Sequence, residues 1–352
     1  MLFFVSYIVG FVLLTSTSAT ELCSLNGEYK DGACVCRMPW EGEKCEVIKV
    51  LPVDNLEHPG ASAYGYAPNV SSWGASIIED DGEYHMFVAQ MKTGGLIGWG
   101  SQSECVHATS KSMDGPFIKS DVALSNECHG PVVIRDPNGE WLMFHQGDAG
   151  GSSSSFMHHS TKPTGPWTPS KTDPGSCGMP TAAYHPNGTL FVICRNGHEL
   201  VRADKWDGTW VKVMPLVTPS SWEDPSLYFD VDGNWHVMYH VYALEPYSSG
   251  IETYSGHAFS VNGLDWTFDQ TQPFGGMVSF TDGTNKTFAT RERPQLIFVG
   301  ENRTTPVGMT SAVSPQPLGP WCDQCHEKAC SQCKITPGRD WTYTIYQPFA
   351  TN

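Results

Sequence analysis

The stretch that decides the fold is residues 222–241, which read WEDPSLYFDVDGNWHVMYHV. Two apolar runs flank the pair Asp232-Gly233, and an Asp-Gly pair tolerates the positive φ angles of a tight hairpin turn. The first run starts with acidic residues and a proline, and the second is rich in aromatic residues. The pattern predicts two antiparallel strands joined by a short turn.

The same unit recurs four more times along the chain. The copies read WGASIIEDDGEYHMFVA (73–89), CHGPVVIRDPNGEWLMFHQG (128–147), CGMPTAAYHPNGTLFVICRNG (177–197) and RERPQLIFVGENRTTPVGMTSAV (291–313). The residues that hold the same place in each copy lie at intervals of 56, 49, 45 and 69: Ala75, Pro131, Pro180, Pro225 and Pro294. Repeats of this length are typical of the four-stranded blades of a β-propeller.

We therefore predict an all-β chain with a five-bladed β-propeller over residues 48–352 and a small disulfide-rich module at 21–47. A long insertion is expected before blade five, and residues 341–348 are expected to supply a closing strand. With 35 Gly and 25 Pro the chain has too many turn formers for a helical bundle, while 40% hydrophobic residues exclude disorder. The net charge of −16 excludes a nucleic-acid binder that works by neutralising phosphates.

Residues 1–20 predict a secretory signal peptide. The apolar run MLFFVSYIVGFVLL precedes small residues that suit cleavage after Ala19 or Thr20, although no Lys or Arg precedes the run, so a retained anchor is the alternative. Twelve cysteines agree with an oxidising compartment, as do four N-glycosylation sequons, at Asn69, Asn187, Asn285 and Asn302. The mature protein is expected to be secreted, extracellular and free of the membrane.

Residues 23–45 read CSLNGEYKDGACVCRMPWEGEKC. The spacing Cys34-x-Cys36-x8-Cys45 resembles the C-terminal half of an EGF-like domain, a family in which six cysteines pair one with three, two with four and five with six. The first and third of these cysteines are both missing here, so the resemblance implies disulfides Cys23–Cys34 and Cys36–Cys45. Such a module either docks a protein partner or serves as a spacer or cap on the larger domain; we favour the second interpretation.

The remaining eight cysteines are expected to form disulfides: Cys105 with Cys128, Cys177 with Cys194, and two bridges of open connectivity among Cys322, Cys325, Cys330 and Cys333. Each of the first two pairs falls on the same blade or on neighbouring blades. The last four are spaced as two CxxC pairs that could bind zinc, but in a secreted chain we favour disulfides. No cofactor is predicted, and no ligand spacing demands a metal ion.

Five blades that each begin with a proline-containing strand resemble the furanosidase-like propellers of glycoside hydrolases, family 43 and its relatives. The resemblance covers nearly all of residues 60–348, and DDGEYHMF and EDPSLYFDVDGNWHVMYH are close to that family's blade motif. It implies that the first residues of the innermost strands converge at one mouth of the central axis. It also implies a carbohydrate substrate, cleaved there by paired carboxylates with retention or inversion.

The three carboxylates of the family pattern do not transfer to this sequence. The pattern expects them at the starts of blades one, two and three, where this chain has WGA (73–75), CHG (128–130) and CGM (177–179). Acidic residues stand instead at blades four and five, in EDP (223–225) and RERP (291–294). We therefore predict Asp224 and Glu292 as the catalytic pair, with Glu223 as a third candidate.

The neighbours of these acids suggest roles for them. Flanking Arg291 and Arg293 would hold Glu292 ionised, which suits a base or nucleophile, whereas Trp222 would raise the pKa of a neighbouring acid. A structural interpretation is equally consistent, with an axial salt-bridge network and an aspartate that caps a turn.

Further substrate-binding side chains are expected among residues near the strand starts and ends: Trp222, Arg195, Arg291, Arg293, His129, His145 and His240. Histidines at matched strand positions would line the axis with imidazoles, and His129 could replace a carboxylate as an acid. Each histidine taken singly fits an ordinary hydrogen-bonded structural residue better.

Two functions follow from these observations. The first is a secreted glycoside hydrolase that acts on a glycan through paired carboxylates at the axis. The alternative is a non-catalytic carbohydrate-binding or adhesion propeller that has lost the catalytic triad of the family. Charged motifs at a narrow axis are costly without a ligand, which favours the hydrolase.

Overall fold

The computed structural model describes residues 23–54, 63–65, 70–92, 95–125, 128–147, 155–175, 177–196, 199–215, 222–241, 254–300, 303–314 and 342–351. Several predicted features lie outside these residues: the signal peptide, Asn69, Asn302, Cys322, Cys325, Cys330 and Cys333. In the described part of the propeller, the helical elements are a 3-10 turn at Leu96–Gly98 and α1 at Trp99–Gln102. Neither comes near the length and apolar character of a membrane-spanning helix.

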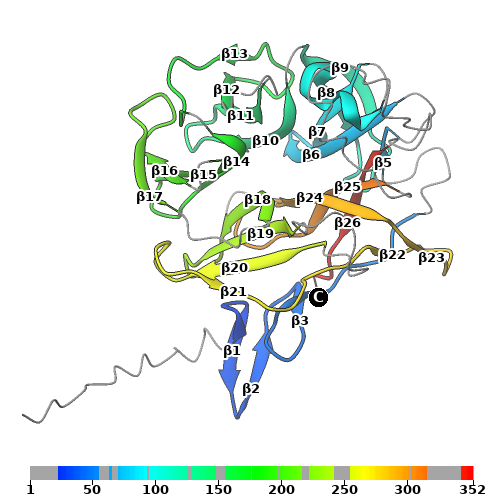
Figure 1. Cartoon of the computed structure of the whole chain (residues 1–352), viewed down its shortest axis with the longest axis vertical. Helices are drawn as coiled ribbons and strands as arrows, with labels where there is room; N and C mark the ends of the chain where they lie inside the picture. Colours follow the sequence, from blue (N-terminus) through cyan, green and yellow to red (C-terminus); the bar gives the residue numbers. More distant parts are fainter. Residues whose placement is uncertain are drawn as a thin grey trace, which may run out of the picture.

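Five antiparallel sheets of four strands form the propeller that the repeats predicted (Figure 1). Blade one holds β6 (Ser71–Asp80), β7 (Glu83–Met91), β8 (Ser103–Ser110) and β9 (Ile118–Leu124). Blade two holds β10 (His129–Arg135), β11 (Trp141–Gln146), β12 (Ser155–Ser160) and β13 (Thr168–Pro169), and blade three holds β14 (Gly178–Tyr184), β15 (Leu190–Asn196), β16 (Glu199–Ala203) and β17 (Val211–Pro215). Blade four holds β18 (Trp222–Phe229), β19 (Trp235–Val241), β20 (Gly256–Ser260) and β21 (Thr267–Phe268).

Blade five closes the ring because it combines strands from the N-terminal and C-terminal ends of the propeller sequence. Its order is β24 (Thr290–Ile297), β25 (Gly308–Ser314), β26 (Tyr343–Pro348) and β5 (Ala63–Tyr64). The C-terminal segment therefore supplies the third strand, and the outermost strand comes from residues that precede blade one. The expected insertion before blade five contains a hairpin of β22 (Met277–Ser279) and β23 (Asn285–Thr287).

Hydroxyl groups on innermost strands join neighbouring blades. Backbone N–H groups of the next blade donate to them in three places: Val133 to Ser76 Oγ (3.1 Å), Leu227 to Thr181 Oγ1 (2.9 Å) and Leu296 to Ser226 Oγ (3.1 Å). Between blades five and one, the Thr310 hydroxyl donates to the carbonyl of Ala75. These buried bonds join four of the five pairs of neighbouring blades and hold their innermost strands in register with one another.

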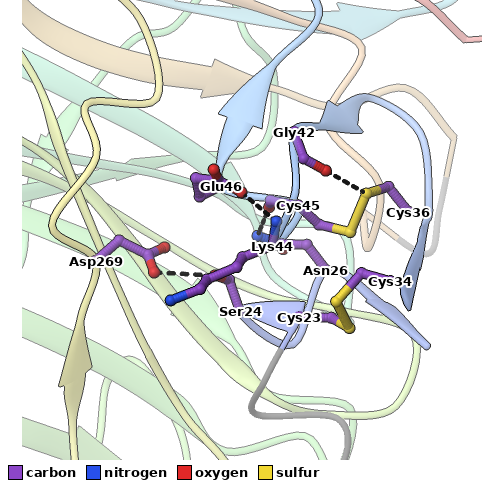
Figure 2. The surroundings of a disulfide bond; sticks show 10 residues. All are labelled: Cys23, Ser24, Asn26, Cys34, Cys36, Gly42, Lys44, Cys45, Glu46 and Asp269. Atoms are coloured by element: carbon purple, nitrogen blue, oxygen red, sulfur yellow. Dashed lines mark hydrogen bonds between the residues drawn. A yellow bond between two sulfur atoms is a disulfide. The ribbon is translucent and has the colours of Figure 1, made fainter. Parts of the chain in front are cut away.

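The N-terminal module is held by the disulfides Cys23–Cys34 and Cys36–Cys45 (Figure 2), as the EGF resemblance implied. Its strands are β1 (Gly27–Lys30), β2 (Ala33–Cys36), β3 (Trp40–Glu41) and β4 (Val47–Ile48). In the propeller, Cys105–Cys128 ties β8 to the start of blade two, and Cys177–Cys194 ties the two innermost strands of blade three. Both bridges were expected from the sequence.

The module packs against blades four and five, as a cap would (Figure 1). Trp40 shares a hydrophobic core with residues of both blades, among them Tyr228 and Leu296. At the edge of this core, Arg37 Nη1 lies 2.7 Å from Asp232 Oδ2. The Ser24 hydroxyl donates to Asp269 (2.9 Å), a bond drawn in Figure 2. Module and propeller thus share buried surface and are expected to unfold together.

Truncation of Trp40 tests this shared core. Trp40→Ala is expected to lower the free energy of unfolding of the whole chain by about 3–5 kcal/mol, because the indole is buried between module and propeller. Chemical denaturation followed by circular dichroism would measure the loss, with exposed Tyr29→Ala on β1 as the matched control. A Trp40→Ala protein whose propeller unfolds at the wild-type midpoint would contradict the shared core.

Candidate functional site

One residue near the start of each innermost strand has a left-handed backbone, and the five residues form a ring about the axis. They are Gly74 (φ 77°), Gly130 (57°), Met179 (50°), Asp224 (52°) and Arg293 (53°). In four blades the register with the second strand shifts at this point, as at a β-bulge. For a residue with a Cβ this conformation costs roughly 1–3 kcal/mol and is characteristic of functional sites.

The ring residues line an axial cavity together with the residues that follow them in each strand. The cavity volume of about 30 Å³ admits a water molecule and not a sugar ring. Glu223 and Glu292 each precede the ring by one residue, so they stand on the side of the ring from which the innermost strands begin.

Arg293 reaches from blade five across the axis. Its Nη2 lies 3.3 Å from Asp224 Oδ1 in blade four. An added Cβ on Gly74 would lie 2.7 Å from Arg293 Cδ, and one on Gly130 would overlap Arg293 Nη1. The two glycines therefore make the space that the guanidinium fills. Where the resemblance expected carboxylates of blades one and two, this chain places a cation of blade five.

His240 lies between the two glutamates. The register of β18 with β19 sets His240 opposite Glu223, and Nδ1 of the histidine lies 3.1 Å from Glu223 Oε1. On its other side, Nε2 lies 4.0 Å from Glu292 Oε1. Counting Asp224 as well, one oxygen or nitrogen atom of each of these four residues lies within 4.8 Å of the others. The three predicted acids thus meet in one cluster, and His240 joins them.

Burial raises the pKa of two carboxyls in this cluster. The pKa of Glu292 rises to about 7, because desolvation outweighs the favourable charge of His240. The pKa of Asp224 is also raised by burial, although Arg293 opposes this shift. The expectation that flanking arginines hold Glu292 ionised is wrong, since Arg291 points elsewhere and burial dominates.

Glu223 and His240 form the charged pair of the cluster. Burial opposes ionisation of Glu223, but the hydrogen bond and charge of His240, helped by two nearby arginines, outweigh it and lower the pKa of this carboxyl. Burial likewise opposes protonation of His240, yet the surrounding carboxylates raise its pKa to about 9. At neutral pH, Glu223 is an anion beside an imidazolium while Glu292 titrates. Two carboxyls whose environments separate their pKa values are the usual sign of an acid and base pair.

Arg291 is not part of the axial site. Its guanidinium donates to Gly275 O (3.0 Å) and Gln347 Oε1 (2.6 Å) and lies 4.6 Å from the centre of the Phe274 ring. Arg291 and Arg293 are two residues apart and would share one face of a regular strand, but the bulge at Arg293 breaks the alternation. Arg291 is therefore a buried structural residue, contrary to its expected role in substrate binding.

His145 is also placed away from the axis. In blade two, Gln146 and not His145 stands opposite His129, the place that His240 holds opposite Glu223 in blade four. His145 Nε2 instead lies 3.1 Å from His158 Nδ1 in the same blade. From the sequence we matched His145 with His240 because each lies in the second strand of its blade. Counting from the hairpin turn of each blade matches Gln146 with His240 instead.

His129 stands at the start of β10 and is buried. Its Nδ1 lies 3.0 Å from Ser103 Oγ, and its ring packs 5.0 Å from that of Trp99. Burial and the charge of Arg293 lower its pKa well below the usual range. A shift in this direction opposes the role of proton donor that we considered for His129.

Trp222 belongs to the core between blades three and four. It is buried and meets the ring of Tyr239 edge-on at 5.7 Å. Its carbonyl accepts a hydrogen bond from Arg195 Nε (3.2 Å). Trp222 is therefore a packing residue and not a stacking platform for a sugar, while Arg195 is held near the acidic cluster.

Comparison with known proteins found similar proteins for both the N-terminal module and the propeller. Residues 20–48 match the family of teneurin-like EGF domains. No curated protein matches the chain in sequence. The structure is similar to the catalytic domain of a Coprinopsis cinerea GH62 α-L-arabinofuranosidase, with a TM-score of 0.58 and 15% identity over 85% of this chain and 97% of that one.

Two further relatives in structure are glycoside hydrolases. A family 117 enzyme from the marine bacterium Zobellia galactanivorans gives a TM-score of 0.53 and 12% identity over 86% of this chain and 90% of that one. A GH43_1 enzyme from Xanthomonas citri, complexed with xylose, gives 0.53 and 9% over 82% and 91%. The chain shares its fold with these glycoside hydrolases. At such identities the likeness establishes the fold and leaves the chemistry to the site.

The raised pKa of Glu292 predicts a pH-dependent contribution to stability. The neutral carboxyl is preferred in the folded state, so its contribution is fully present below about pH 4.5 and is lost as the pH rises through about 7. Glu292→Gln cannot ionise, so its stability relative to the wild type should rise by up to about 1.4 kcal/mol per pH unit between about pH 4.5 and 7 and stay level above that. Thermal unfolding across that range measures the difference, with exposed Glu79→Gln as control. A difference that stays constant with pH would refute the raised pKa.

Proposed function

We propose that this protein is a glycoside hydrolase whose catalytic carboxyls come from blades four and five. The observation that carries the proposal is the position of Glu223 and Glu292 on either side of His240, whose Nδ1 and Nε2 lie 3.1 Å and 4.0 Å from their Oε1 atoms. Burial raises the pKa of Glu292 to about 7, while the hydrogen bond and charge of His240 lower that of Glu223. Both stand where innermost strands begin in a fold shared with glycoside hydrolases. Glycoside cleavage generally needs one carboxylic acid and one carboxylate.

In this proposal Glu292 is the general acid. It donates its proton to the glycosidic oxygen as the bond from that oxygen to the anomeric carbon breaks. Glu223 acts on the anomeric carbon, and His240 keeps it ionised through their 3.1 Å contact. Asp224 has the most buried side chain of the three acids and faces Arg293, so we assign it to the support of the pair and not to substrate contact.

The spacing of the carboxylates favours retention of configuration. Oxygen atoms of Glu223 and Glu292 lie within 4.8 Å of each other. Retaining enzymes hold their two carboxyls about 5 to 5.5 Å apart, whereas inverting enzymes leave about 6.5 to 9.5 Å for a water molecule. Glu223 would thus attack the anomeric carbon directly, and water would then release the sugar from it.

Two substitutions test these roles on a panel of aryl furanosides and pyranosides. Glu292→Gln should lower kcat about 10²- to 10⁴-fold for poor leaving groups and much less for dinitrophenyl glycosides, which need no proton. Glu223→Ala should lose activity and regain it with azide as a glycosyl azide. Glu79→Gln, an exposed change on β6, should match the wild type. A wild type that binds glycans and cleaves none of the panel would replace the hydrolase by the carbohydrate-binding alternative.

We also propose that the chain is a secreted glycoprotein. Four disulfides are present among the described residues, and the sequon asparagines Asn187 and Asn285 are exposed. Expression in secreting eukaryotic cells should place the protein in the medium with a mass that falls on treatment with an N-glycosidase. Asn187→Gln and Asn285→Gln should each remove one glycan. Retention in the cell without glycans would contradict this assignment.

A further inference from the structure

We propose that the sugar bound at the axis carries an anionic group, specifically a carboxylate, and that Arg293 recognises this group. This inference rests on the proposed function, since it names the substrate class of the same site. It follows from the position of the guanidinium and from its Nε donor, which is buried without a hydrogen bond.

The guanidinium of Arg293 is held at the floor of the site. The left-handed backbone of Arg293 directs its side chain to the axis, and the glycines of blades one and two leave it room. A ligand that enters the axis from the strand starts passes Glu223 and Glu292 before it reaches this guanidinium. The sugar unit at the cleaved bond is the one that reaches deepest, so the anionic group belongs to that unit.

Arg293 and its partner keep unused hydrogen-bonding capacity. The 3.3 Å contact between Arg293 Nη2 and Asp224 Oδ1 is an ion pair, while Arg293 Nε and Asp224 Oδ1 are buried without a hydrogen bond. A buried donor without an acceptor is costly, and its cost is relieved when a ligand supplies the acceptor. A carboxylate matches the planar fork of a guanidinium with two parallel bonds, which a neutral hydroxyl does not.

The charges around the floor also favour an anion. The chain as a whole has a net charge of −16, but Arg293, Arg195 and His240 bring three cationic groups to the cluster. Of the three facing acids, Glu223 is paired with His240 and Asp224 with Arg293, and burial raises the pKa of Glu292, so below neutral pH the three cationic groups outnumber the ionised acids of the cluster. The cluster therefore has cationic charge to share with a ligand near and below neutral pH.

Ligand titrations by NMR on the full chain test the inference. The probes are methyl glycosides of glucuronic and galacturonic acid in both anomers, with methyl glucosides and galactosides as neutral counterparts and glucose 6-sulfate as the sulfate arm. The acidic sugars should bind at least tenfold more tightly than their neutral counterparts. Arg293→Gln should abolish this preference, Arg293→Lys should keep part of it, and Arg202→Gln, an exposed change on β16, should keep all of it.

The outcomes separate this inference from the hydrolase proposal. Equal binding of acidic and neutral sugars by the wild type, or binding of neither, overturns the inference even if the Arg293 variants fail to fold. A preference for the sulfate over the carboxylates overturns the choice of carboxylate. Arg293-dependent binding of acidic sugars without cleavage of their aryl glycosides supports the ligand class and removes the hydrolase. Cleavage of neutral glycosides without a preference for acidic sugars supports the hydrolase proposal and overturns the ligand class.

Discussion

The left-handed residue near the start of each innermost strand is the constraint on which the site depends. In four of the five blades it coincides with a register shift that interrupts the alternation of side chains where the strand approaches the axis. In blades one and two a glycine adopts this conformation without strain, and in blades three, four and five a residue with a side chain is forced into it. Three residues are strained as a result, and two of them, Asp224 and Arg293 from adjacent blades, reach the axis because of this conformation.

The site is asymmetric because the ring is asymmetric. Blades four and five contribute the charged groups, and blades one and two contribute empty space through Gly74 and Gly130. Arg293 fits only because both glycines are present, so these three positions form one unit that spans the ring. The same arrangement explains why burial, and not the charge of neighbouring arginines, decides the pKa of Glu292.

The module extends the core of the two blades that hold the site. Beneath Trp40, a chain of contacts runs from Asp230 through His236 and His257 to Asp269, with the two imidazole nitrogens 3.1 Å apart. Burial lowers the pKa of His236 to about 4. The indole of Trp40 packs 4.8 Å from the ring of His257, so the module covers part of this chain of polar groups.

The repeat pattern determined the propeller, because each copy carries its own turn and alternation and these are local properties. Cysteine spacing and family resemblance likewise led to four disulfides that the structure contains. The acids at blades four and five were found for the same reason, since each stands at a defined place in a repeat.

The sequence did not decide the direction of individual side chains. Arg291 bonds to Gly275 and Gln347 although its neighbour Glu292 joins the acidic cluster, and His145 contacts His158 within its own blade. A side chain's direction depends on bulges and on strand register, which are set by pairing between strands far apart in the chain. The pKa of each carboxyl depends in turn on burial, which only the assembled ring creates.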